Sequence, residues 1–428
     1  MPIPNSARFA LKYNVLLWGA LVLFVAPAAS AQTTAKLSLQ DALTIALNNN
    51  PEITAAQKEI EAASGRVLQA GRIPNPELSV TFNEVPTNLD FGNASEKDVG
   101  LSQPIEFPGK RGLRVEVAEH DRSIAEFALL RTESIVSSKV KRAYYQILLA
   151  REVVSNLEFT ITLLSDFLRT VTERYQAGTS KYLDVIRAKV EVTRLRNDLV
   201  EAKREQQTRL GELNVLLGRS GTTSFVLSDS LTYQPLSMLQ DSAVELYANR
   251  SSFLKIVERE AQRSQSVLNL ARTSYLPDFS LGVTLQKRPG TVSSTGSSNY
   301  LGFEFGASVP LWFWQGPKGE AQEAEALLDI ATIRSSAARL RVRQNILSAF
   351  RSATVAQEQV QVFDLSLLRD VEDQLRAGIS AYQNNQVDAL NLFDIYRTFR
   401  STKIEYVRAL YNLLAAKAEL EAAGENPE

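Results

Sequence analysis

Cysteine is absent from the 428 residues, and histidine occurs only once, as His120. Without cysteine the chain can form no disulfide, no thiolate metal site and no cysteine nucleophile, and lipid attachment at an N-terminal cysteine is excluded. A Ser-His-Asp catalytic set would depend on His120 alone, which stands in a charged helical segment and is expected on the surface. The sequence therefore predicts no enzyme, no catalytic residues, no bound cofactor and no metal site.

An excess of charge of one sign is also missing, because 47 Lys and Arg face 48 Asp and Glu. This balance predicts no nucleic acid partner. The longest apolar run, Val15–Ala26, is shorter than the ~20 residues that a membrane helix needs. Arg8 and Lys12 precede it, and Ala29-Ser30-Ala31 follows with the form of a cleavage site. We therefore predict a signal peptide over residues 1–31, with a short N-terminal anchor helix as the alternative.

An internal repeat organises the remainder, with one copy over residues 32–235 and the other over 236–428. Each copy begins with a seam of residues spaced alternately three and four apart, which indicates an amphipathic helix. The helical spacing stops near a proline in both copies, at Pro76 and at Pro277. The seams are Ile53, Ala56, Ile60, Ala63, Val67 and Ala70, and Leu254, Val257, Ala261, Ser264, Leu268 and Ala271.

Alternating apolar and polar residues follow each proline and predict β-hairpins at about 77–104 and 278–310. Such strands suit a tilted crossing of a bilayer. Four strands cannot close a barrel and lipid tolerates no open edge, so the strands either join those of other copies or lie outside a membrane. Aromatic residues just after the hairpins favour the membrane as an aromatic belt, with packing inside loops as the alternative. They are Phe107, Trp312, Phe313 and Trp314.

Long helices follow each hairpin. A seam with alternating steps of four and three runs from Val136 to Tyr175 and predicts left-handed coiled-coil packing. The helix from about Arg111 to Tyr175 would be ~100 Å long. A seam with the same steps is predicted in the second copy, at Ile346, Ala349, Ala353, Ala356, Val360, Phe363 and Leu367. Return helices are expected from Val185 and Leu392, because both segments continue the seam. Turns between outgoing and return helices are predicted where both copies read A-G-x-S, at Ala177-Gly178-Thr179-Ser180 and Ala377-Gly378-Ile379-Ser380.

Several segments resemble the outer-membrane factor (outer membrane efflux protein) family typified by TolC. The resemblance covers nearly all of the mature chain, and one segment, Gln103–Arg111, resembles in particular the branch that serves cobalt-zinc-cadmium exporters. The other segments are Leu39–Ile53, which resembles the opening helix of the family, Pro74–Leu78 at the first strand, and Tyr175–Val185 at the periplasmic tip.

The resemblance implies a mainly α fold with a small membrane β part. Two structural repeats of long coiled-coil helices would form an α-barrel, and four strands per chain would be pooled into a 12-strand β-barrel of a homotrimer. It implies a passive conduit for small molecules or metal ions in the outer membrane of a Gram-negative cell. The implied partners are outer-membrane lipid, a periplasmic adaptor and an inner-membrane RND-type or ABC-type pump. The alternatives are the outer component of type I protein secretion and a soluble periplasmic coiled-coil interaction protein.

Few site residues can be transferred from the family. Asp184 matches an acidic position at the periplasmic tip, and Asp388 or Asp394 is its candidate in the second copy. Carboxylates converging on a pore axis would favour cations and help to set an aperture, although Asp184 also suits its helix N-terminus. Arg187 is a candidate to pair across the tip. The expected adaptor contacts are the two turns, with Ala177, Gly178, Ser180, Ala377, Gly378 and Ser380.

Overall fold

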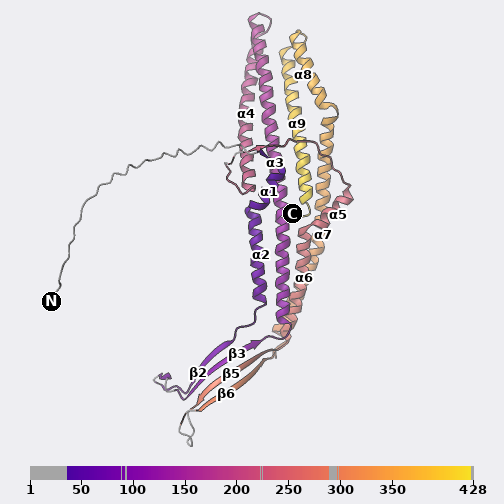
Figure 1. Cartoon of the computed structure of the whole chain (residues 1–428). Coiled ribbons are helices and arrows are strands. Elements are labelled where there is room, and N and C mark those ends of the chain that lie inside the picture. The colour runs from indigo at the N-terminus through magenta and orange to yellow at the C-terminus, as the bar shows by residue number, and fades with distance from the viewer. Residues whose placement is uncertain are drawn as a thin grey trace, which may run out of the picture.

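The computed structural model describes residues 36–87, 89–91, 94–221, 223, 225–288, 296 and 298–425, so the predicted signal peptide lies outside the described residues. A bundle of long helices carries a four-stranded sheet at one end and two helical tips at the other (Figure 1). None of the helices in these ranges combines the length and the apolar character that crossing a membrane requires.

The order of elements repeats along the chain. The first half contains α1 (Leu39–Asn49), α2 (Pro51–Ala70), β2 (Glu77–Asn83), β3 (Glu96–Ile105), α3 (Lys110–Gln176) and α4 (Tyr182–Leu216). The second half contains α5 (Gln240–Arg250), α6 (Ser252–Arg272), β5 (Asp278–Arg288), β6 (Ser298–Ser308), α7 (Gly316–Val362), α8 (Leu368–Gln383) and α9 (Ala389–Ala422). The prediction of long helices and four strands is therefore confirmed.

Helix α3 sets the length of the molecule. Its 67 residues extend over ~100 Å at ~1.5 Å per residue. Helices α2 and α4 lie one above the other along α3, and α6 and α9 take the corresponding places beside α7 (Figure 1). Two short helices thus cover each long one, and the places where they meet need their own polar partners because helix ends expose unpaired backbone groups.

Two buried cap residues join these short helices end to end. The Asn50 side chain accepts a hydrogen bond from the Glu52 N–H (2.8 Å) at the start of α2 and donates one to the Leu216 carbonyl (2.8 Å) at the end of α4. In the second half, the Ser251 hydroxyl accepts a hydrogen bond from the Leu254 N–H (3.1 Å) at the start of α6. It donates one to the carbonyl of Gly424 (2.6 Å), just after the end of α9. One side chain therefore satisfies both helix ends at each joint.

Glu425 completes the second joint. Its carboxylate accepts hydrogen bonds from the backbone N–H groups of Ser252 (2.8 Å) and Phe253 (3.0 Å), the first residues of α6. Arg131 of α3 donates to the Glu425 carbonyl (2.7 Å). The carboxylate is buried, and its negative charge lies at the positive end of the α6 dipole. A residue close to the C-terminus therefore caps a helix formed much earlier in the chain.

A short parallel pair, β1 (Lys36–Leu37) with β4 (Val226–Leu227), crosses the middle of the bundle. The Tyr144 hydroxyl of α3 donates to Asp229 Oδ2 (2.7 Å), and the Leu39 N–H donates to the same oxygen (2.9 Å). Burial favours the neutral acid, but these hydrogen bonds and the charge of Arg151 outweigh it and lower the pKa of Asp229. The ionised carboxylate thus fastens the crossing segment to α3.

The tips share one apolar core, although they belong to different halves of the chain. Phe167 of α3 contacts Tyr382 of α8 edge-on, with ring centroids 4.9 Å apart, and Phe393 of α9 in the same way at 5.3 Å. Val171, Leu195 and other buried residues of α3 and α4 extend this cluster. The two hairpins of helices therefore pack as one four-helix unit instead of standing separately.

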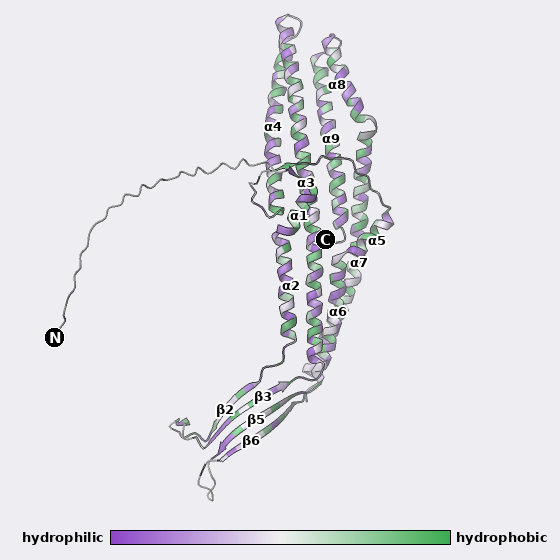
Figure 2. Ribbon diagram, viewed as in Figure 1, coloured by the Kyte–Doolittle hydropathy of each residue, from purple (hydrophilic) through white to green (hydrophobic). Residues whose placement is uncertain are grey.

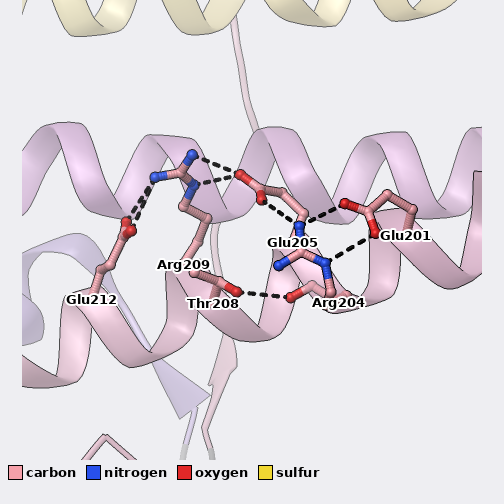
Figure 3. A network of polar contacts seen from close by, with 6 residues as sticks. All are labelled: Glu201, Arg204, Glu205, Thr208, Arg209 and Glu212. Carbon is pink, nitrogen blue, oxygen red and sulfur yellow. Dashed lines mark hydrogen bonds and ion pairs between the residues drawn. The ribbon is translucent and has the colours of Figure 1, made fainter.

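The surface of α4 carries a ladder of charges (Figure 3). Arg209 bonds to Glu205 (2.7 Å) and to Glu212 (2.9 Å), and Arg204 bonds to Glu201 (2.6 Å). All these pairs lie three or four residues apart within one helix, where oppositely charged side chains are neighbours on the helix surface and favour the helical conformation. The ladder keeps this face of α4 solvated and helical and leaves the packing to the opposite face.

A π-helical segment, η3 (Phe363–Leu367), separates α7 from α8 and was not predicted. On the side of η3 nearer the sheet, corresponding residues of the two halves are separated by a constant number of positions in the sequence. Val136 and Val154 of α3 correspond in this way to Val342 and Val360 of α7, and all four are buried. At the tips this separation is one residue longer, because Tyr175 of the first half corresponds to Tyr382 of the second. A π turn accommodates one extra residue within a helix. The predicted seam therefore breaks at η3, and it resumes with Val371 and Leu375.

Candidate functional site

One face of the sheet is apolar across its middle, over two complete rows of side chains. Its strands are antiparallel in the order β2-β3-β5-β6, and their register aligns Leu78, Leu101, Val283 and Phe303 in one row. The next row on the same face is Val80, Val99, Leu285 and Leu301. All eight side chains are exposed, with Phe303 79% accessible. Figure 2 shows both hydrophobic and hydrophilic colours along the strands.

The opposite face of the sheet is polar and made of small residues. One of its rows is Ser79, Gly100, Thr284 and Gly302, and the next is Glu77, Ser102, Gly282 and Glu304. A Cβ at Gly100 would lie 2.6 Å from Ser79 Oγ, so glycine allows these strands to pair without displacing the Ser79 side chain. A sheet with one apolar and one polar face separates a non-aqueous phase from water.

Aromatic side chains lie where the sheet meets the helices. Trp312, Phe313 and Trp314 follow β6 and are all more than half exposed. Phe107 follows β3, is half-buried, and donates its backbone N–H to Asp278 Oδ1 (2.9 Å). The four residues predicted as a belt therefore lie at the same end of the sheet. Indole and phenyl rings suit the boundary between lipid and water.

The first tip turn lies where the sequence predicts it. Gly178 has a φ of 76°, and the N–H groups of Gly178 and Thr179 bond back to the carbonyls of Tyr175 and Arg174. This is the Schellman arrangement that ends a helix, and a left-handed residue favours glycine. Ala177 and Ser180 flank that residue as expected. This turn is the outermost part of the first half.

The second predicted turn is wrong, because Ala377, Gly378 and Ser380 lie within α8. The turn occurs later, at Asn384–Val387, where Asn385 takes the left-handed conformation with a φ of 57°. Gly378 is buried instead, and a Cβ there would lie 2.6 Å from Ile395 Cδ1. This glycine therefore permits close approach of α9 to α8 and does not end a helix.

A groove of about 650 Å³ lies between the two tips. Three of the four predicted aperture residues line it, namely Asp184, Arg187 and Asp388. Asp388 also caps α9 by accepting a hydrogen bond from the Asn391 N–H (2.9 Å). Asp394 lies outside the groove and pairs with Arg397 (3.3 Å) one turn further along α9. The structure thus brings two carboxylates and one guanidinium of the predicted set together, and separates the fourth member.

Arg174 holds the two tips together, and sequence reasoning missed it. Its guanidinium donates to the Tyr382 carbonyl (3.0 Å), to Asn385 Oδ1 (2.8 Å) and to the Gln383 carbonyl (2.7 Å). It also lies 4.8 Å from the centre of the Tyr382 ring, within cation–π distance. Burial raises the pKa of Tyr382, while the Arg174 charge opposes this rise. Arg174 therefore binds the end of α8 through its last carbonyls.

Within the described ranges, no three His, Asp or Glu side chains are grouped so that they could hold a metal ion. The carboxylates of the tip groove are spread over separate helix starts, and the arginines among them supply compensating charge. The arrangement can attract or exclude passing ions by charge. The tip groove is therefore suited to electrostatic selection of ions.

A protein-family model described as outer membrane efflux protein matches residues 42–219 and 244–424. The cobalt-zinc-cadmium resistance protein CzcC of Cupriavidus metallidurans is 23% identical over 387 residues, which cover 90% of this chain and 89% of the relative. The toluene efflux pump outer membrane protein TtgF of Pseudomonas putida is 23% identical over 421 residues, covering 89% and 82%. Both likenesses therefore extend over most of each chain.

Solved structures show the same fold. The open state of the Neisseria gonorrhoeae MtrE outer membrane channel superposes with a TM-score of 0.75 at 17% identity, covering 91% of this chain and 89% of that one. The outer membrane protein VceC of Vibrio cholerae gives a TM-score of 0.72 at 16% identity, with 91% and 97% covered.

Proposed function

The chain belongs to the outer membrane efflux protein family, and we propose that it serves as a homotrimeric duct for metal ions. As a member of that family it is an outer-membrane channel of tripartite efflux systems and not an enzyme, and its helices form a periplasmic domain. Family membership decides against the alternative of a soluble periplasmic interaction protein. The observation that carries the assignment is the exposed apolar face of the sheet at the end of a long helical bundle.

The trimer is supported by the free edges of the sheet. Strands β2 and β6 are the outer strands, so each leaves a row of backbone N–H and carbonyl groups without a partner in the described chain. In lipid each such group costs several kcal/mol, about 2–7, so the edges must be paired. Pairing of β6 with β2 of the next copy closes twelve strands around three chains. The polar face then surrounds the water-filled interior.

The tips are proposed as the place of contact with a periplasmic adaptor, because members of the family act together with an adaptor and an inner-membrane transporter. The contact surfaces are the turn around Ala177, Gly178 and Ser180 and the turn Asn384–Val387. Ala377 and Ser380 would add only their exposed side chains on α8. The pump that completes the assembly is proposed to be of the RND or ABC type.

Metal ions are proposed as cargo on the strength of the relatives. Besides CzcC, the nickel-cobalt-cadmium resistance protein NccC of Alcaligenes xylosoxydans xylosoxydans matches 70% of this chain at 23% identity. The Gln103–Arg111 segment points to the same branch. The duct needs no tight metal site, because a conduit releases its cargo. Protein secretion by a type I system is the alternative within the same fold, and export of organic solvents is suggested by the name of TtgF.

The cargo proposal is tested in cells that lack the chain. Deletion should raise sensitivity to cobalt, zinc and cadmium and leave sensitivity to toluene unchanged. Full-length chain should restore growth, and a chain carrying Phe303→Lys on the apolar face should not. If deletion raised sensitivity to toluene and not to the metals, the duct would be assigned to organic solvents. Loss of a secreted protein without any metal phenotype would assign it to type I secretion.

The carboxylates at the tips are proposed to select cations at the periplasmic aperture. We expect Asp184→Ala combined with Asp388→Ala to reduce the cation preference of single channels in a planar bilayer, because both carboxylates line the tip groove. Asp394→Ala should have a weaker effect, since Asp394 is paired with Arg397 outside the groove. Arg187→Ala should act in the opposite direction and increase the preference. Reversal potentials in a salt gradient measure all three variants.

Asp166→Ala on α3 is the matched control, because its carboxylate is paired with Arg169 within the same helix (3.2 Å). Unchanged selectivity in the double variant would remove these carboxylates from the aperture. It would leave the duct itself intact, because conductance is read from the same traces.

A further inference from the structure

A second groove, of about 530 Å³, lies at the junction between the sheet and the helices. The segment that leads from α2 into β2 forms one wall, and the turn from β3 into α3 forms the other. Apolar groups line most of it, with Ile73 64% exposed and Ile105 39% exposed. Phe107 and three prolines, Pro74, Pro104 and Pro108, complete this lining. An open groove with this much apolar lining has unfavourable contact with water.

The polar groups of the groove are already paired, with one exception. Glu106 is neutralised by Arg114 of α3, which binds both of its carboxylate oxygens. The Gln103 amide donates to the carbonyls of Pro74 (2.8 Å) and Pro104 (2.9 Å). Arg111 is exposed at the groove, and its side chain makes no hydrogen bond or ion pair within the described residues. The groove therefore combines apolar walls with one uncompensated positive charge.

The groove opens toward lipid. Strand alternation places Gln103 and Ile105 on the same face of β3 as Leu101, which belongs to an apolar row of the sheet. The strand ends here and the periplasmic helices begin, so the groove lies at the level of lipid headgroups in the inner leaflet of the outer membrane. Gly109 and Gly112 stand beside Arg111, and a Cβ on either would meet no atom within 4 Å. Space is therefore open beside the backbone on both sides of Arg111.

We propose that this groove binds a phospholipid of the periplasmic leaflet, with the phosphate on Arg111 and the glycerol and first acyl carbons on Ile73, Ile105 and Phe107. A guanidinium pairs with phosphate oxygens through parallel N–H groups. The apolar walls favour a lipid over a soluble anion, which would leave them in contact with water. The start of α3 has no acidic residue in its first turn, so its dipole adds to the positive potential and does not oppose it.

This proposal rests on the outer-membrane location of the sheet and is independent of cargo and of the aperture. The test titrates the detergent-purified full chain with phosphatidylglycerol and counts bound lipids by native mass spectrometry. Arg111→Gln should weaken retention of the tightest lipid about tenfold, because a hydrogen-bonded charge is lost. Arg111→Lys should fall between this variant and the original chain. Ile73→Gln should weaken retention through the apolar wall alone.

Arg194→Gln is the control, because Arg194 is an exposed arginine of α4 in the periplasmic part, and its side chain makes no hydrogen bond or ion pair with any described residue. Equal retention by Arg111→Gln and the original chain would overturn the proposal, as would an equal loss in Arg194→Gln. Displacement of the lipid by millimolar inorganic phosphate would show a site for soluble anions instead. If Arg111→Gln does not assemble, Ile73→Gln decides. Unchanged conductance in these variants keeps the result separate from channel function.

Discussion

Arg174 connects the two tips by three hydrogen bonds from its side chain. Its guanidinium donates hydrogen bonds to the last carbonyls of α8 and lies over the ring of Tyr382. It therefore acts as a C-terminal cap of α8 that is supplied by another helix. Any outward movement of one tip relative to the other must break these contacts. The proposed aperture therefore depends on Arg174 for its resting shape, in addition to the carboxylates that give it charge.

Arg174→Gln should increase the leak through the resting channel. Glutamine is shorter and uncharged, so the variant loses charge-assisted hydrogen bonds that contribute roughly 1.5–3 kcal/mol each in favourable settings. Leak current of single channels in a planar bilayer is the measurement. Arg169→Gln removes an arginine of α3 that pairs only with Asp166 of the same helix, and its leak should match that of the original chain. A tight Arg174→Gln channel would show that the apolar tip core alone sets the aperture.

Two glycines show what a sequence can and cannot predict for single residues. Gly178 and Gly378 stand in the same A-G-x-S context, yet only Gly178 has a positive φ. A Cβ at Gly378 would instead lie 2.6 Å from Ile395 Cδ1 of the neighbouring helix, and such a contact leaves no local signal in the sequence. Arg174 was missed for the same reason, since its partners lie 208 to 211 residues away. Local conformation could be predicted, and contacts between distant segments could not.

At the scale of elements, η3 explains how the two halves differ. The seams of α3 and α7 follow from residue spacing alone, and they were predicted correctly up to Val360. One extra residue then enters the second half, and a continuous α-helix would rotate everything beyond it by about 100°. The π turn absorbs this residue locally. Val371 and Leu375 thereby reach the same core as Leu164 and Phe167 of the first half.

Deletion of Ser366 from η3 should be tolerated. The segment can become α-helical, which gives the second half the same spacing as the first and keeps the tip core in register. Deletion of Thr162 from the continuous α3 should instead rotate Leu164 and Phe167 out of the core and abolish assembly. Both residues are exposed, so neither deletion removes a buried side chain. Trimer yield and helical circular dichroism measure both outcomes. Equal failure of both chains would show that the π turn itself is needed.

For the whole molecule, the two faces of the sheet decide where the chain can reside. Phe303→Lys places a charge on the apolar face, where lysine in the middle of a bilayer costs about 2–4 kcal/mol. We expect it to abolish recovery of trimers from membranes. Glu304→Lys introduces the same side chain one residue later, on the polar face, and should assemble. Heat-modifiable migration of membrane extracts on gels distinguishes the two variants. Normal recovery of Phe303→Lys would place that face away from lipid.

Much of this large-scale design is visible in the sequence. The repeat, the hairpins and the coiled-coil helices follow from periodicities within each segment, so they could be predicted. The joints could not, because Asn50 and Ser251 look like ordinary helix caps until the ends of α4 and α9 are placed against them. The groove at the junction between the sheet and the helices likewise forms only when β3 and the segment before β2 come together. Contacts between elements that are distant in the sequence could therefore not be predicted from it.

The cap that Glu425 places on α6 also depends on the order in which the chain is synthesised. A polypeptide is made and exported from its N-terminus, so Ser252 and Phe253 exist long before the carboxylate that accepts their N–H groups. A chain interrupted before residue 425 keeps those donors unmet, at a cost of about 1–3 kcal/mol for each buried group. The joint between α6 and α9 can therefore form completely only in chains synthesised as far as residue 425.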